Sequence, residues 1–185
     1  MASLLQRLCA VFRKSPAPER LGPSALRVRR MTYRDLNAVG AMENASFGSP
    51  WRVSSYARAL SDSNQWFVVA EMDHRLVGYA GFWLENGRAH IAKLAVHPDY
   101  RRRGIGSELL RQMIGQIRRV RCDEAFLEVR RSNSAAQELY RRFGFHFERV
   151  QPNAYPNDGE DAFILARGDL LASKPAPSVP LPAED

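Results

Sequence analysis

Hydrophobic and polar positions alternate with two different periods along the middle of the chain. Residues 25–29 alternate between apolar and basic, which predicts a β-strand because successive side chains of a strand point to opposite faces. Runs rich in β-branched and aromatic residues predict six further strands, at 65–72, 75–85, 88–96, 124–129, 145–151 and 161–166. Apolar residues three and four positions apart predict helices at 36–45, 53–60, 107–117 and 133–142.

The order of these elements indicates the fold class. It is β-α-α-β-β-β-α-β-α-β-β, which predicts an α/β protein with a mixed sheet and helices on both faces. Thr32 and Asp35 have the spacing of a capping box before the first helix. Asn86-Gly87 is a two-residue hairpin signal between two long strands. We expect the folded domain to span residues 25–171.

The two ends of the chain differ from this middle part. Residues 1–13 carry apolar residues at helical spacing, with arginines and no acidic residue. This composition fits an amphipathic helix on a membrane surface, an organelle-targeting segment, or a leader that docks on the domain or stays loose. Proline-rich stretches follow this segment and close the chain. We expect a flexible leader and linker over residues 1–24, and a disordered tail over 172–185.

Length and composition restrict the class of protein. A chain of 185 residues is long enough for one ordinary domain, and 45% hydrophobic with 25% charged residues is the balance of a globular protein. No apolar run approaches the roughly 20 residues that span a bilayer. We therefore expect a cytoplasmic monomer without a membrane span.

Cysteine, histidine and net charge narrow the candidate chemistry. The two cysteines, Cys9 and Cys122, and the four histidines have no spacing typical of metal ligands, so metal-free chemistry is expected. The net charge of +7 favours an anionic partner, which includes nucleic acid, an acidic membrane and a phosphorylated cofactor. Charge alone does not choose among these partners.

A glycine-containing loop joins the strand that ends near Val96 to the next helix. Arg101, Arg102 and Arg103 precede Gly104 in this loop. A helix start offers unpaired backbone N–H groups, and glycine lets a ligand approach the backbone closely, so the loop predicts a pyrophosphate site. The patterns of P-loop nucleotide-binding proteins and of three-glycine dinucleotide sites are absent. The alternative is an ordinary strand-turn-helix junction with exposed arginines.

The pattern Arg101-x-x-Gly104-x-Gly106 is similar to the acetyl-CoA signature of the GCN5-related N-acetyltransferase (GNAT) family, Gln/Arg-x-x-Gly-x-Gly/Ala. Residues 126–145 resemble the strand and helix that complete the cofactor site of that family. FGSPW, residues 47–51, and residues 154–165 resemble two substrate-binding segments of the ribosomal-protein-alanine N-acetyltransferases and their archaeal and eukaryotic relatives. The resemblance covers nearly all of residues 25–171 and implies the GNAT acyl-CoA N-acyltransferase fold.

The resemblance implies acetyl-CoA as cosubstrate. The strand edge before the loop would pair with the pantetheine arm and direct a backbone N–H at the thioester oxygen, while the loop holds the pyrophosphate. Asn133 would hydrogen-bond the cofactor, cap the following helix, or do both. The implied cofactor-binding residues are Leu94, Ala95, Val96, Arg101, Arg102, Arg103, Gly104, Ile105, Gly106, Ser107 and Asn133.

Two residues match the catalytic pair of the family. Glu128 matches the general base, and an acidic side chain inside an apolar strand is costly unless it is paired or used. The alternative is that Glu128 simply faces solvent, Arg130 or Arg131. Tyr140 matches the general acid that protonates the departing thiolate, and the alternative is a packing role in the core.

The implied substrate-binding residues are Phe47, Pro50, Trp51 and Tyr155. The family pattern has a tyrosine where this chain has Ala154, and an arginine that is absent before Glu160, so the peptide preference is open. Asp158, Glu160 and Asp161 form an acidic cluster that either favours a basic second residue in the substrate or is a solvated hairpin end.

The leading hypothesis is an enzyme that transfers acetyl from acetyl-CoA to the N-terminal α-amine of a protein, such as a ribosomal protein with N-terminal alanine. A second hypothesis is acetylation of a small amine or a lysine side chain. A third is a non-catalytic module that binds RNA or the ribosome through its many arginines. The aromatic residues typical of single-strand binders are not interleaved with these arginines, and we expect no direct contact with nucleic acid.

Overall fold

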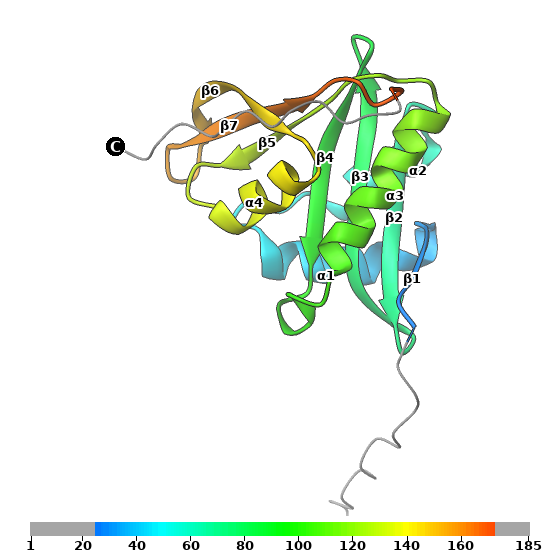
Figure 1. The fold of residues 1–185 in the computed structure, drawn as a ribbon. Helices are drawn as coiled ribbons and strands as arrows, with labels where there is room; N and C mark the ends of the chain where they lie inside the picture. Colours follow the sequence, from blue (N-terminus) through cyan, green and yellow to red (C-terminus); the bar gives the residue numbers. More distant parts are fainter. Residues whose placement is uncertain (1–24, 173–185) are drawn as a thin grey trace, which may run out of the picture.

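The computed structural model describes residues 25–172 (Figure 1). The leader and linker expected at residues 1–24 lie outside the described residues, as does all but the first residue of the expected tail. None of the helices in the described part is long and apolar enough to cross a membrane.

The described chain contains the predicted elements in the predicted order, and the mixed α/β class is confirmed. The capping-box pair Thr32 and Asp35 opens a short 3-10 turn, Tyr33–Asp35, directly before the first α-helix. The elements are β1 (Arg27–Arg30), α1 (Leu36–Ser46), α2 (Val53–Ser61), β2 (Gln65–Met72), β3 (Arg75–Glu85), β4 (Arg88–Val96), α3 (Ile105–Arg119), β5 (Ala125–Arg130), α4 (Ser134–Arg142), β6 (His146–Tyr155) and β7 (Glu160–Arg167).

The strands of residues 25–172 form one seven-stranded sheet in the order β1-β2-β3-β4-β5-β7-β6. Each neighbouring pair is antiparallel except β4 and β5. The predicted turn between β3 and β4 is confirmed, because Asn86 and Gly87 have φ angles of 49° and 79°, as a tight hairpin requires. The β6–β7 hairpin is longer than predicted. A register shift between Gln151 and Tyr155 lets β6 continue past Pro152.

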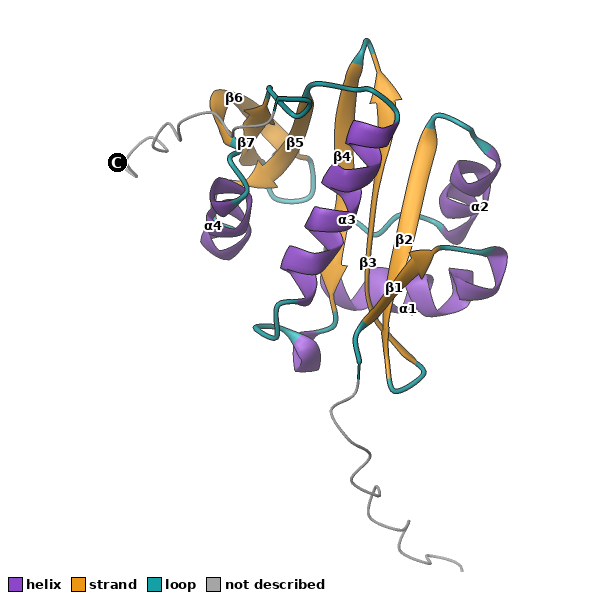
Figure 2. Cartoon of the chain, turned by 45° about the vertical axis from the view of Figure 1, so that its right-hand side comes forward, coloured by secondary structure: helices purple, strands orange, loops and turns teal. Residues whose placement is uncertain are grey.

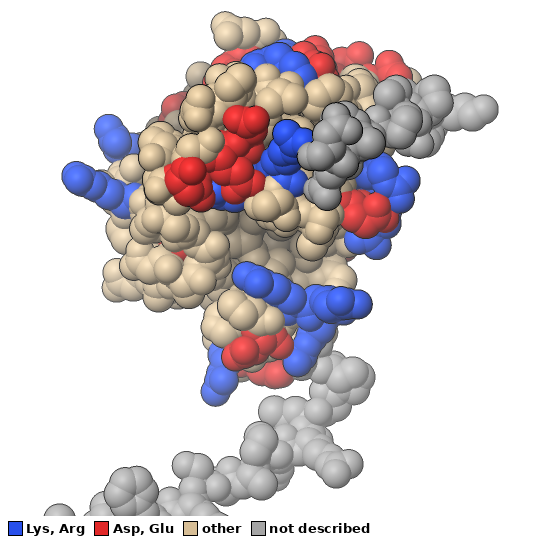
Figure 3. Space-filling view, turned by 90° about the vertical axis from the view of Figure 1, so that its left-hand side faces the viewer, with Lys and Arg blue, Asp and Glu red and all other residues tan. Residues whose placement is uncertain are grey.

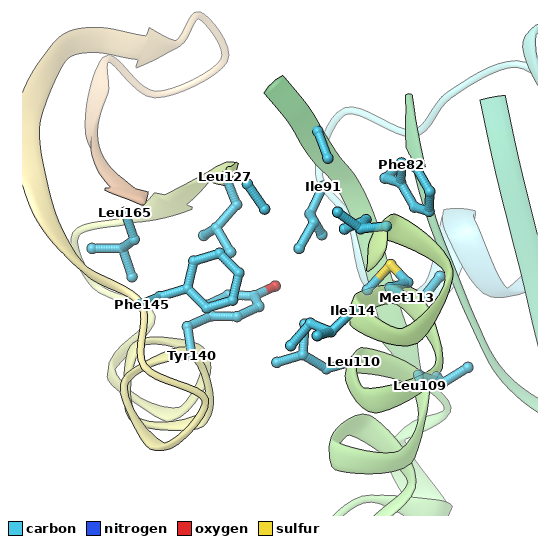
Figure 4. Packing of buried hydrophobic residues seen from close by; sticks show 14 of the residues in the cluster. Phe82, Ile91, Leu109, Leu110, Met113, Ile114, Leu127, Tyr140, Phe145 and Leu165 are labelled. Atoms are coloured by element: carbon cyan, nitrogen blue, oxygen red, sulfur yellow. The ribbon is translucent and has the colours of Figure 1, made fainter. Parts of the chain in front are cut away.

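Helices cover both faces of the sheet, as Figures 1 and 2 show. One face carries α3 and α4, and its core includes the fully buried side chains of Leu109, Leu110 and Met113 of α3 (Figure 4). Burial of each such side chain contributes about 1.5–3 kcal/mol. The other face carries α1 and α2, packed on Phe67, Val69 and Tyr79.

The centre of the sheet opens between β4 and β5. These parallel strands are paired only from Ala89 to Ile91 on β4 and from Ala125 to Leu127 on β5. Beyond this point the two strands diverge (Figure 1). A bulge at Ala92 shifts the pairing of β4 with β3, so that Gly81 faces Lys93 while Phe82 faces Ile91. The opening exposes backbone in the middle of the sheet and positions the site described next.

Candidate active site

A cavity of about 490 Å³ lies where β4 and β5 diverge. Its walls come from the α1–α2 loop, β3, β4, β5, α4 and the β6–β7 turn. The residues that line it include Phe47, Trp51, Trp83, His90, Lys93, Leu94, Glu128, Arg130, Asn133, Tyr140 and Tyr155. Segments far apart in the sequence therefore meet at one cavity. Figure 3 shows basic side chains gathered below a recess in one face of the molecule and acidic side chains above it.

The predicted strand edge has one free side. Leu94, Ala95 and Val96 pair with β3, and none of them has a partner on β5. Ala95 is buried in the core under α1 and α2, so only its backbone is available to a ligand. An extended ligand therefore has unpaired backbone of β4 to bind on the cavity side.

The loop after β4 has the geometry predicted for an anion site. Gly104 is the N-cap of α3 with a φ of 81°, a left-handed conformation that glycine adopts without strain. The first hydrogen bond of the helix runs from Glu108 N to Gly104 O, at 3.0 Å. The amides of Ile105, Gly106 and Ser107 therefore precede the intrahelical ladder. The Ile105 side chain is buried in the core, so this residue offers only its backbone.

The three arginines of the loop are exposed, and none forms an ion pair with any of residues 25–172. Arg101 donates through Nε to the carbonyl of Val96 at 3.2 Å, and the Arg103 guanidinium lies 5.1 Å from the ring centre of Tyr100. Arg102 has a positive φ of 61°. These contacts leave guanidinium N–H groups available beside the helix start.

Glu128 is an exposed side chain of β5 that lines the cavity. The alternative partner Arg130 is engaged elsewhere, because its guanidinium pairs with Asp158 and Glu160. Glu128 forms no ion pair within the described residues. Its carboxylate is thus free to accept a proton from a group or water in the cavity.

Tyr140 lies where both the packing role and the catalytic role would place it. It packs against Phe145 in the core, with ring centres 5.9 Å apart, and it also lines the cavity. Its hydroxyl points away from Phe145 into the space between α4 and α3 (Figure 4). Burial raises the pKa of Tyr140, and nearby Tyr155 adds to this effect. The hydroxyl is therefore protonated at neutral pH and able to donate.

Asn133 caps α4, because its Oδ1 accepts from Ala136 N at 3.1 Å. The residue also lines the cavity, and the cap engages only its Oδ1. The structural alternative for Asn133 is thus present, and it is compatible with a role in cofactor binding.

The predicted substrate residues do not all reach the cavity. Phe47, Trp51 and Tyr155 line it, whereas Pro50 lies exposed in the same loop and is not part of the lining. The Arg130 guanidinium lies 3.8 Å from the ring centre of Tyr155. Burial raises the pKa of Tyr155, while Arg130 opposes this.

The acidic cluster is bonded within the protein. Asp158 pairs with Arg130 at 2.8 Å, and Glu160 also pairs with Arg130. Glu160 accepts hydrogen bonds from Ser132, which lower its pKa to about 2 with help from Arg130. Asp161 accepts from Asn153 N at 2.9 Å. These carboxylates stabilise the hairpin end, which accounts for the cluster without a substrate.

The sequence patterns did not single out His90. A bulge at Ala92 turns His90 and Lys93 to the same face of β4, and no one-letter pattern indicates such a bulge. His90 stacks on Phe126 at 4.4 Å and its Nδ1 has no hydrogen-bond partner within the described residues. Burial lowers the pKa of His90, although Glu85 and Glu128 oppose this.

The buried residue Glu43 of α1 was also missed. Its carboxylate accepts hydrogen bonds from Trp51 N, Tyr56, Tyr79 and Lys93. A signal was available, because Glu43 lies one turn after Val39 on the apolar side of the predicted helix. No group of three or more His, Cys, Asp or Glu side chains is placed to hold a metal ion among residues 25–172.

Comparison with known proteins identifies the family. The model of the acetyltransferase (GNAT) family matches residues 36–145. The chain is 32% identical over 134 residues to the ribosomal protein bS18-alanine N-acetyltransferase of Escherichia coli K12, covering 71% of this chain and 90% of that protein.

Two solved structures show the same fold. The ribosomal-protein-S18-alanine N-acetyltransferase from Escherichia coli has a TM-score of 0.72 at 28% identity, covering 78% of this chain and 94% of the other. A chain of the NatC complex bound to Gag peptide and CoA has a TM-score of 0.68 at 24% identity, covering 77% and 98%. Since the family model spans more than half of the chain, and the Escherichia coli relative is similar along most of its own length, this chain belongs to the GNAT family and is an acetyltransferase.

Proposed function

We propose that the protein transfers an acetyl group from acetyl-CoA to the N-terminal α-amine of a protein, with a ribosomal protein that begins with alanine as the expected substrate. The observation that carries this proposal is the composition of the cavity. Glu128 and Tyr140, on two different elements, line the same cavity as Phe47, Trp51 and Tyr155. The name of the Escherichia coli relative supports a protein N-terminus as acceptor.

The described residues fit acetyl-CoA as the acetyl donor. The free edge of Leu94–Val96 would hold the pantetheine arm through the backbone, and the amides at the start of α3 would hold the pyrophosphate together with Arg101, Arg102 and Arg103. Gly106 belongs to this surface, since a Cβ there would lie 3.4 Å from Leu139 and 3.7 Å from Leu94. When bound, acetyl-CoA supplies an acetyl thioester.

Glu128 is the proposed general base. The attacking amine must be neutral, and an α-amine has an ordinary pKa of about 7.7–8.0, so it needs only modest help to lose its proton. Glu128 takes that proton directly or through a water molecule, which leaves the nitrogen lone pair free to form the new C–N bond.

Tyr140 is the proposed general acid. Its hydroxyl donates the proton that the sulfur of the leaving group gains when the C–S bond breaks. An ordinary thiol pKa of about 8.5 lies below that of a phenol near 10, and burial raises the pKa of Tyr140 further. Because the phenol is the weaker acid, the transfer to the departing thiolate is uphill, and the tyrosinate must regain a proton from solvent to complete the turnover.

Mass spectrometry of peptides after incubation with acetyl-CoA tests the proposal. A peptide with a free N-terminal alanine should gain one acetyl group on its α-nitrogen. A peptide with a blocked N-terminus and a free lysine should remain unmodified. Acetylation of the lysine peptide alone, or of small amines alone, would assign the enzyme to the second hypothesis.

A further inference from the structure

Glu43 is a buried charge outside the proposed chemistry, and it connects five parts of the fold. It lies on α1 with no exposed surface. Its Oε2 accepts hydrogen bonds from Tyr56 of α2 and Tyr79 of β3. Its Oε1 accepts from the backbone N of Trp51, at 2.8 Å, and from Lys93 of β4, at 2.7 Å. The carboxylate thus ties the α1–α2 loop to both central strands.

Lys93 makes a second connection to the same loop. Its side chain is 9% exposed, and it lines the cavity. The ammonium lies 4.2 Å from the ring centre of Phe47 and 4.7 Å from that of Trp51, within the range of cation–π attraction. Phe47 and Trp51 begin and end the FGSPW segment. Lys93 therefore contacts both ends of the loop, and Glu43 holds the backbone at one of them.

Packing alone does not account for a charged pair at this position. Moving two charges out of water is costly, and apolar residues of similar volume often stabilise a protein as well or better. The pair differs from apolar residues because hydrogen bonds have defined directions. Each bond to the Glu43 carboxylate fixes a donor group on a different element of the fold. The effect of the pair is therefore on where the loop lies more than on how stable the domain is.

We infer that Glu43 and Lys93 are positioning residues that hold Phe47 and Trp51 at the acceptor side of the cavity. This inference rests on the proposed function, because it assigns the loop to the incoming peptide. The cofactor side is built from β4 backbone and the start of α3, and no side-chain hydrogen bond or ion pair within residues 25–172 joins the start of α3 to this pair. Disturbing the pair should thus weaken peptide binding and leave acetyl-CoA binding unchanged.

The test compares Lys93→Met, Glu43→Gln and the double variant with the wild type. Because the loop would contact the peptide equally before and during the reaction, its displacement removes binding and not rate, and we expect the KM for an alanine peptide to rise roughly tenfold or more in each single variant. The kcat should stay within about threefold and the acetyl-CoA Kd within about twofold of wild type, as for a loss of uniform binding. Lys93→Arg, which keeps a cation near both rings, should restore part of the lost affinity.

The double variant distinguishes an effect on the position of the α1–α2 loop from an effect on the stability of the domain. Removing both charges leaves no unpaired buried charge, so its Tm should recover relative to the single variants. Its peptide KM should remain high, because the contacts of the Lys93 ammonium with Phe47 and Trp51 are still missing. Asp35→Asn is the matched control, since Asp35 is another buried carboxylate, paired with Arg29 and outside the cavity lining. It should lower Tm while leaving the peptide KM unchanged.

Amide hydrogen exchange of residues 47–51 gives a readout that does not depend on catalysis. Exchange there should accelerate in Lys93→Met, while the first turn of α3 is unaffected. Peptide KM and loop exchange both at wild-type values in the folded variants would overturn the inference. An acetyl-CoA Kd that weakens in step with the peptide KM would also overturn it. A wild type that acetylates no peptide, with loop exchange still accelerated in the variant, would remove the proposed acceptor but retain the positioning role.

Discussion

The two ends of the cavity are built in different ways. The proposed cofactor end consists mainly of backbone: the free edge of β4, where Leu94 lines the cavity, and the first amides of α3, which lie outside the cavity lining and follow β4 in one stretch that ends at Ser107. The acceptor end consists of side chains from the α1–α2 loop, β3, β4, β5 and the β6–β7 turn. Backbone binding requires a local conformation, whereas side-chain binding requires several elements to be held in fixed relative positions.

This difference indicates which substitutions each end tolerates. A substitution on the surface of the cofactor loop keeps the amides in place as long as the φ angles are kept. At the acceptor end a single buried residue such as Glu43 accepts hydrogen bonds from four partners, so its substitution disturbs all of them. We therefore expect relatives that use the same coenzyme but different substrates to differ mainly in the residues of the acceptor end.

The largest effect is expected where the two ends meet, at Glu128. Glu128→Gln should lower kcat by about 10²-fold or more, the usual contribution of a general base, with acetyl-CoA Kd unchanged. Glu148→Gln, an exposed carboxyl on β6, is the control and should keep wild-type kcat. A kcat for Glu128→Gln within twofold of wild type would remove Glu128 from the mechanism.

Tyr140→Phe tests the other catalytic role with little disturbance of packing. The hydroxyl forms no hydrogen bond within residues 25–172, so the phenylalanine keeps the core contacts. We expect kcat to fall by about 10²-fold, with Tm nearly unchanged, as for loss of a positioned proton donor. Unchanged steady-state rates would indicate that Tyr140 only packs.

A glycine substitution should affect the cofactor end alone. Gly104 has a φ of 81°, so in Gly104→Ala the free loop should relax to another conformation, and restoring the binding conformation at a cost of about 1 kcal/mol should weaken acetyl-CoA binding roughly fivefold. Gly87→Ala is a matched control, with a φ of 79° in the β3–β4 turn and open space around its Cβ. Calorimetric titration should find the Kd of the Gly87 variant at the wild-type value. An equal loss of acetyl-CoA affinity in both variants would mean that the substitutions act through the stability of the domain and not through the loop before α3.

The smallest effect on activity is expected far from both ends, at Asp35, whose role is in stability. Hydrogen bonds from Arg29 and Thr32 lower the pKa of Asp35 from 3.8 to about 2. A lowered pKa means that its stabilisation is present above pH 4 and is lost as the pH falls from about 4 to 2, by up to about 2 kcal/mol. Urea unfolding at pH 6 and pH 2.5 should show a larger loss in wild type than in Asp35→Asn. An equal loss of unfolding free energy in the two proteins would contradict the assignment of this pH dependence to Asp35.

The fold and the conformation of the loop before α3 were largely predictable from sequence because their signals are local. Hydrophobic periodicity and residue type predicted every α-helix and strand of the described residues, and Asn86-Gly87 predicted the central hairpin, but neither 3-10 helix was predicted. The binding of the cofactor at the Arg101–Gly106 pattern stays a prediction. The acceptor end was predicted in part: Phe47, Trp51 and Tyr155 line the cavity and Pro50 does not.

The remaining features depend on tertiary geometry. The bulge at Ala92 sets which residues of β4 face the cavity, and it leaves no mark in the pattern of apolar positions. The pairing of Arg130 with Asp158 and Glu160 joins residues about 30 positions apart, so their mutual neutralisation could not be read from the cluster itself. Glu43 and Lys93 lie 50 positions apart and meet only in the folded sheet.

Calorimetric titration of the purified wild type with acetyl-CoA, without peptide, tests the central claim most directly. The cavity between β4 and β5 predicts saturable binding with one site per chain, retained in Lys93→Met and weakened in Gly104→Ala. A wild type that gives no saturable heat would contradict the assignment of this cavity to the coenzyme, and with it the proposed reaction.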